Sequence, residues 1–117
     1  MPVPPIRLPR IRGTQVGLKN PAQVDTLKAD MLAGRFDYLA PRGRIAGIRD
    51  ERMMFHVKDG HHRVVAALEI YAETGDMLHL LQLLAWGKWD DKPVGPWESR
   101  PMPSRHWWGA LRNWIGF

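Results

Sequence analysis

The sequence predicts a small single-domain α+β protein in which a mixed sheet packs against two or three helices. Its 117 residues suit one domain with a real core. Helical periodicity over residues 20–33 and 62–74 flanks two short apolar runs within residues 44–58. The chain has no cysteine, so packing alone must stabilise it, and disulfides, thiolate nucleophiles and zinc–thiolate sites are excluded.

The first helix is predicted over residues 20–33. Asn20 can cap it, Pro21 suits the first helical position, and Gln23 stands where a capping box needs its partner. Gly34 then supplies a C-terminal stop. The apolar residues between them recur at helical spacing and are expected in the core: Val24, Leu27, Met31 and Leu32.

Two short strands joined by a polar turn are expected within residues 44–58, followed by an apolar, alanine-containing helix over residues 62–74. Gly75 stops that helix, which we expect to be the most buried one. Residues 77–86 are almost entirely apolar, and we expect a buried strand there, with a short helix as the alternative.

The two ends of the chain have unusual compositions. Prolines and arginines predict an extended arm or linker over residues 1–13, ahead of a domain over residues 14–117. The segment from Pro93 onward is rich in proline and tryptophan and is expected to wrap the core, an aromatic platform being the alternative. Its tryptophans are Trp97, Trp107, Trp108 and Trp114.

The charge is distributed unevenly. The formal net charge is +5, and residues 1–63 contain twelve Lys or Arg against six Asp or Glu, whereas residues 64–117 contain five against six. Such an excess favours a polyanionic partner, nucleic acid or nucleotide, although it can also serve solubility. No apolar run approaches the ~20 residues that span a bilayer, and the start does not resemble a signal peptide.

The segment Asp59-Gly60-His61-His62-Arg63, between the second strand and the following helix, is the most distinctive chemical motif. A helix N-terminus presents free N–H groups and a partial positive charge, so it attracts anions. Gly60 lets the backbone approach a ligand closely, and the Arg63 guanidinium suits phosphate. His61 or His62 could act as general base, with Asp59 orienting the imidazole.

Each of these residues also has a purely structural interpretation. Asp59 could cap the helix, His61 could be a solvated turn residue, and His62 could be a buried histidine bonded to a carbonyl. His56, on the preceding strand, is a secondary candidate that could face the same pocket. No metal site is predicted, since His61 and His62 would diverge on a helix and no carboxylate cluster accompanies them. The sequence leaves open whether Mg²⁺ takes part.

The order helix, two strands and then Asp-Gly-His-His-Arg before an alanine-rich helix resembles the ParB/sulfiredoxin superfamily over residues 14–90. The resemblance implies that Gly60, His62 and Arg63 contact nucleotide phosphates. Sulfiredoxins have cysteine in place of His61, so sulfinic acid reduction is excluded. The sequence is most similar to the ParB-like domain found at the C-terminus of Rhs and other secreted polymorphic toxins of bacteria. This resemblance implies a nuclease-like or nucleotide-hydrolysing domain.

The sequence thus leads to a leading function and two alternatives. The leading one is a secreted toxin-type effector domain that hydrolyses a phosphodiester or nucleotide in the target-cell cytoplasm, with Asp59, His61, His62 and Arg63 as catalytic residues. A cognate immunity protein is the expected inhibitor. The alternatives are a non-catalytic nucleotide- or nucleic-acid-binding module, and nucleotide-dependent group transfer onto a protein.

Overall fold

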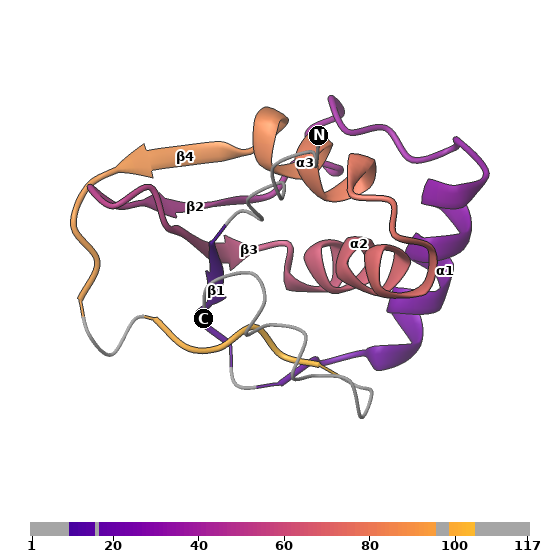
Figure 1. Ribbon diagram of the computed structural model, residues 1–117, viewed down its shortest axis with the longest axis horizontal. Helices are drawn as coiled ribbons and strands as arrows, with labels where there is room; N and C mark the ends of the chain where they lie inside the picture. The colour runs from indigo at the N-terminus through magenta and orange to yellow at the C-terminus, as the bar shows by residue number, and fades with distance from the viewer. Residues whose placement is uncertain (1–9, 16, 96–98, 105–117) are drawn as a thin grey trace, which may run out of the picture.

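The computed structural model describes residues 10–15, 17–95 and 99–104 (Figure 1). Within these ranges it contains three helices and a four-stranded mixed sheet, which confirms the α+β prediction. The elements in chain order are β1 (Ile11–Gly13), α1 (Pro21–Leu32), β2 (Ala46–Arg49), β3 (Phe55–Asp59), α2 (His61–Thr74), α3 (Leu78–Trp86) and β4 (Lys88–Asp91).

The strands lie in the order β1-β3-β2-β4. β2 and β3 are the two strands predicted within residues 44–58 and run antiparallel, while β1 is parallel to β3 and β4 is parallel to β2. The Asp50 carboxylate closes the turn between β2 and β3, because it accepts the backbone N–H groups of Arg52 and Met54 at 2.9 and 3.0 Å. In this strand order β3 lies between β1 and β2, and its C-terminal end leads directly into α2.

α1 confirms the helix predicted over residues 20–33, but its first turn is held differently. Pro21 occupies the first helical position. The Asn20 side chain makes no capping hydrogen bond, so the predicted capping box does not form. Instead, the backbone N–H of Gln23 donates to the Asn20 carbonyl at 3.0 Å. Gly34 follows the helix with a positive φ of 74°, as a glycine stop requires.

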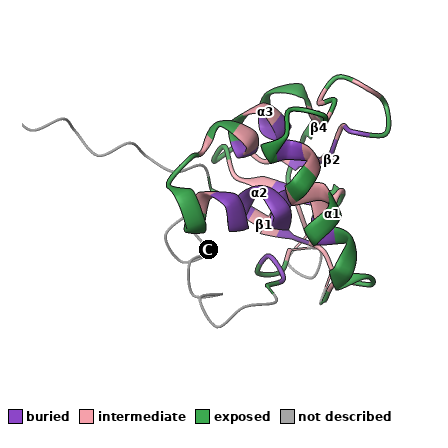
Figure 2. Ribbon diagram, turned by 90° about the vertical axis from the view of Figure 1, so that its right-hand side faces the viewer, coloured by how far each residue is buried: buried purple, intermediate pink, exposed green. Residues whose placement is uncertain are grey.

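α2 is the most buried helix, as predicted. Eight of its 14 residues are buried, against two in α1 and three in α3. It lies between the sheet and α1 in Figure 1 and is largely buried in Figure 2, whereas the outer faces of α1 and α3 are exposed. Gly75 ends it in the left-handed region, with its N–H donating to the Tyr71 carbonyl at 2.8 Å.

The prediction of a strand over residues 77–86 was wrong, because this segment forms α3. Asp76 favours the helix by accepting the Leu78 backbone N–H at 2.8 Å. The leucines then divide by helical spacing: Leu80, Leu83 and Leu84 are buried, whereas Leu78 and Leu81 are 55% and 43% exposed. One apolar face is therefore enough to pack α3 against the core. Directly after α3 the chain forms β4, a strand at the edge of the sheet.

The predicted arm over residues 1–13 extends less far than expected. Residues 1–9 lie outside the described part of the chain. Residues Ile11–Gly13 are extended, as predicted, but they pair with β3 at one edge of the sheet. Ile11 is fully buried in the core, so the folded domain begins before residue 14.

The segment 99–104 packs on the domain. Arg100 and Gly13 exchange two backbone hydrogen bonds of 2.7 Å, and Met102 is 1% exposed in the core. The tryptophans for which a wrapping role was expected, Trp97, Trp107, Trp108 and Trp114, lie outside the described residues. None of the helices in the described ranges has the length and apolar character needed to cross a membrane.

Candidate functional site

The turn from β3 into α2 places the predicted motif at the N-terminus of the most buried helix. Asp59 is the last residue of β3 and is exposed. Gly60 follows with a φ of 102°, which L-residues rarely adopt. A Cβ at this position would also overlap the Ile45 side chain and lie 3.1 Å from Nη1 of Arg63. The backbone here therefore requires glycine for both its conformation and its close packing.

Four of the five motif residues line one pocket of about 210 Å³, here called the turn pocket. Asp59, Gly60, His62 and Arg63 come from the β3–α2 turn. The first two turns of α1 complete the lining with Gln23 and Leu27. These two residues were missed as pocket residues because their spacing identified only a helix, and the α1–α2 contact is a tertiary feature.

The hydrogen bonds of His62 and Arg63 fix how both side chains face the turn pocket. Nε2 of His62 accepts the Asn20 backbone N–H at 3.1 Å, so the neutral imidazole carries its proton on Nδ1. Nη1 of Arg63 donates to the Arg44 carbonyl at 3.4 Å. Both side chains are half-buried. An imidazole and a guanidinium thus form part of the pocket lining.

His61 does not line the turn pocket and is buried on the other side of the turn, with 3% of its surface exposed. Its Nε2 accepts the Thr14 backbone N–H at 3.0 Å. Burial, and to a smaller extent the neighbouring His62, lower the pKa of His61, against a raising effect of Asp59 and of a hydrogen bond to the Val57 backbone. His61 is thus held neutral with its acceptor nitrogen occupied, which does not suit the general base expected from the sequence.

The structure therefore reverses the structural interpretation of the two histidines. His61, expected in a solvated turn, is the buried one, whereas His62, expected to be buried, is half-exposed. The orienting role expected of Asp59 is not seen, because within the described ranges its carboxylate makes no hydrogen bond to either imidazole. Asp59 instead contributes a negative charge to the turn pocket.

His56 lies away from the turn pocket. It alternates with Phe55 and Val57 along β3, so its side chain points to the opposite face of the sheet from theirs. There it is 2% exposed and hydrogen-bonds to Asp50 and Ser99 at 2.9 Å each. The structure thus separates His56, the secondary candidate, from the four motif residues that line the turn pocket.

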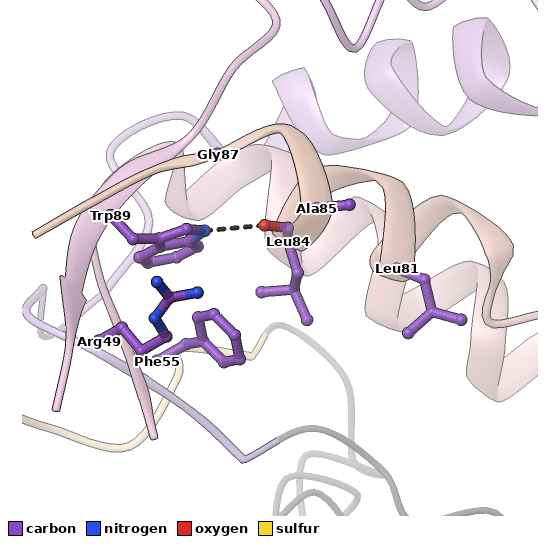
Figure 3. A pocket seen from close by; sticks show the side chains of 7 residues that line it. All are labelled: Arg49, Phe55, Leu81, Leu84, Ala85, Gly87 and Trp89. Carbon is purple, nitrogen blue, oxygen red and sulfur yellow. Dashed lines mark hydrogen bonds between the residues drawn. The ribbon is translucent and has the colours of Figure 1, made fainter. Parts of the chain in front are cut away.

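A second hollow of about 520 Å³, here called the aromatic pocket, lies between α3 and the sheet (Figure 3). The Phe55 and Trp89 rings are in edge-to-face contact, with their centroids 4.8 Å apart, and the Arg49 side chain lies beside them (Figure 3). Its polar groups are already paired: Trp89 Nε1 donates to the Leu84 carbonyl at 2.8 Å, and Arg49 contacts both carboxylate oxygens of Asp91. This pocket therefore brings no reactive group together.

Across the described ranges, no three His, Asp or Glu side chains gather closely enough to hold a metal ion. One carboxylate, Asp59, lines the turn pocket. Mg²⁺ is commonly held by one or two carboxylates together with substrate phosphates, so Asp59 could share such an ion with a bound ligand.

No protein-family model matches the chain, and comparisons with curated proteins and with solved structures gave no significant match either.

Proposed function

We propose that this protein binds a phosphate-bearing ligand, a nucleotide or a nucleic acid, in the turn pocket. The observation that carries the proposal is the grouping of Gly60, His62 and Arg63 around one pocket at the N-terminus of α2. The N–H groups of the first turn of a helix have no partner within the helix, and the peptide dipoles make this end partly positive. An anion is therefore the ligand that the pocket attracts.

The side chains strengthen this preference for phosphate. Arg63 provides a planar, permanently charged group, which forms short, strong hydrogen bonds with phosphate oxygens. The Nδ1–H of His62 adds a neutral donor, because its Nε2 is already occupied by the Asn20 N–H. The excess of basic residues over residues 1–63 raises the local concentration of polyanions.

Hydrolysis of a phosphodiester or nucleotide is the second candidate, and Asp59 favours it. In both histidines Nε2 accepts a backbone N–H, so neither offers this nitrogen as a base. The Asp59 carboxylate lines the turn pocket and could deprotonate or orient a water molecule, alone or with a bound Mg²⁺. Catalysis would then depend on Asp59 and Arg63 rather than on His61.

The biological setting is proposed from the family resemblance alone. We propose a secreted toxin-type effector that acts in the target-cell cytoplasm and is neutralised by an immunity protein. Expression in bacteria without that partner should be toxic, and Arg63→Ala should relieve the toxicity. Growth equal to that of an empty-vector control would contradict the toxin role and leave ligand binding to be judged separately.

Binding is tested with nucleoside triphosphates, single-stranded RNA and DNA, and duplex DNA, each with and without Mg²⁺. Arg63→Ala should weaken binding of the preferred ligand about tenfold or more, since a hydrogen bond to a charged group contributes ~1.5–3 kcal/mol. Arg35→Ala is the matched control, because Arg35 lies beyond the far end of α1, is 65% exposed and pairs with Asp30. Equal loss in both variants would mean only nonspecific charge attraction, and would overturn the proposal.

The same samples separate binding from hydrolysis. Product formation that disappears in Asp59→Asn, while ligand affinity is kept, would establish the hydrolase. Binding without turnover in the wild-type protein would establish the binding module. Loss of turnover in His61→Gln alone would contradict the assignment of His61 as a structural residue.

A further inference from the structure

A continuous chain of hydrogen bonds links Asp50, His56 and Ser99 on the sheet face opposite to α2. Nε2 of His56 lies 2.9 Å from Oδ2 of Asp50, and Nδ1 of His56 lies 2.9 Å from Oγ of Ser99. The three residues come from the β2–β3 turn, from β3 and from the segment 99–104. Tertiary structure alone brings this carboxylate, imidazole and hydroxyl into line.

The donors and acceptors fix the direction of the chain. The Asp50 carboxylate only accepts, and its Oδ1 already takes the N–H groups of Arg52 and Met54. Burial raises the pKa of Asp50, but the hydrogen bonds from His56, Met54 and Arg52 outweigh it and hold the pKa below its usual value. The ionised Oδ2 therefore accepts the Nε2–H of His56. The lone pair on Nδ1 is left facing the Ser99 hydroxyl.

Ser99 also has a cationic neighbour. Nε of Arg12 donates to Oγ of Ser99 at 2.6 Å. A guanidinium at this distance stabilises negative charge on that oxygen and on an oxyanion formed beside it. Among the hydrogen bonds of the described residues, the hydroxyl proton of Ser99 points to Nδ1 of His56.

The central residue of these hydrogen bonds, His56, is the most buried of the three. The side chains of His56 and Asp50 are 2% and 11% exposed, so bulk water does not compete for their hydrogen bond. Ser99 is half-buried, so part of this residue lies at the surface. A general base requires only that its nitrogen reach the nucleophile's proton, and 2.9 Å satisfies this requirement.

We propose that Ser99 is a nucleophile for acyl transfer, with His56 as its general base and Asp50 as the residue that positions His56. The substrate class is a carboxylic ester. Ser99 Oγ forms a bond to the acyl carbon while its proton passes to Nδ1 of His56. The bond to the leaving oxygen breaks, and that oxygen takes the proton and departs as an alcohol. Water then gives a proton to Nδ1 of His56 and attacks the acyl carbon of the acyl-serine. The bond from that carbon to Ser99 Oγ breaks, and Oγ takes the proton back from His56, which releases the acid and restores Ser99.

The first test needs no variant, because the sequence contains a built-in control. Its only two serines are Ser99 and Ser104. The full chain is incubated with a fluorophosphonate probe, which reacts with activated serines, and the modified peptide is identified by mass spectrometry. We expect Ser99 to be labelled at least about 100-fold faster than Ser104, the range that a positioned general base supplies. Equal rates at the two serines, or no labelling, would overturn the proposal.

Variants then distinguish catalysis from a purely structural role of these hydrogen bonds. With p-nitrophenyl acetate, Ser99→Ala should abolish the burst of p-nitrophenol, whereas Ser104→Ala should keep it. Asp50→Asn should slow labelling of Ser99 in protein that is still folded, and Asp50→Glu should restore part of the rate. If Asp50→Asn and His56→Gln lower the melting temperature but label Ser99 at the wild-type rate, the chain is structural and the proposal is wrong.

Discussion

At the scale of single residues, the neighbours of each histidine decide what it can do. His61 lies against the backbone of Gly13, where an added Cβ would be 3.1 Å from the imidazole. Its Nε2 accepts the Thr14 N–H. Protonation of His61 would therefore place two donors face to face and leave a charge in the core. This side chain stabilises the join between β1 and α2 in its neutral form.

This arrangement gives the folded state a pH dependence. Burial and His62 lower the pKa of His61 below its ordinary value of 6.5 in the folded protein. At a pH between the folded-state pKa and 6.5, the imidazole therefore binds a proton in the unfolded chain but not in the folded one. The contribution of His61 is complete above about pH 6.5 and declines as the pH falls below it. Urea unfolding at pH 7.5 and 5.5 should show lower stability at pH 5.5. His61→Gln, which does not titrate, should show a smaller decline and cost ~1–3 kcal/mol at pH 7.5. An unchanged pH dependence would contradict this assignment.

The sequence predicted which residues come together better than how they are arranged. The motif identified the pocket residues Asp59, Gly60, His62 and Arg63, because a glycine and a basic residue at a helix start have a local physical meaning. It could not show which histidine turns inward. That depends on the backbone N–H groups of Thr14 and Asn20, which lie 47 and 42 residues away along the chain.

At the scale of elements, one lysine ties α1 to α2. Nζ of Lys28 lies 3.0 Å from Glu69 and 2.6 Å from Glu73, on successive turns of α2. Glu69 is 1% exposed, so its carboxylate needs hydrogen-bond partners from the protein in place of water. Burial lowers the pKa of Lys28, but the hydrogen bonds to Glu73 and Glu69 outweigh it and raise the pKa above 10.5. The lysine is thus charged in the folded state.

Replacing Lys28 should therefore destabilise the helix pair. Lys28→Met keeps most of the side-chain volume but removes the charge that faces Glu69, and we expect a loss of ~2–4 kcal/mol in urea unfolding at pH 7.5. Glu73→Gln is the matched control, because Glu73 is 44% exposed and its pairing should contribute less than ~1 kcal/mol. Similar losses in both variants would show that the buried pair does not dominate.

The helices illustrate what periodicity can and cannot predict. α1 and α2 were both predicted because residues at their ends favour a helix start or stop. Pro21 and Gly34 mark the two ends of α1, and Gly75 marks the end of α2. α3 was mistaken for a strand because its leucines fill both faces, so periodicity gave no direction. A local feature that favours the helix is Asp76, whose carboxylate accepts the Leu78 N–H. β1 and β4 were missed because short edge strands depend on long-range pairing.

At the scale of the whole molecule, both ends of the described chain meet at one edge of the sheet. β1 pairs with β3 on one side, and Gly13 exchanges hydrogen bonds with Arg100 on the other. Arg12 and Ser99 add a side-chain hydrogen bond of 2.6 Å. The segment 99–104 therefore covers the edge that β1 would otherwise expose.

Met102 provides the apolar anchor of this closure, and its replacement tests how much the fold depends on it. It is 1% exposed within the main core, so Met102→Ala should cost ~2–5 kcal/mol in the free energy of unfolding through lost contacts and a cavity. Met53→Ala is the control, because Met53 is 61% exposed and its loss should change stability by less than ~0.5 kcal/mol. Hydrogen exchange should show faster exchange at the Gly13 and Arg100 amides in Met102→Ala, since the anchored segment would open more often. Equal stability of the two variants would mean that the segment 99–104 rests on the sheet without holding it closed.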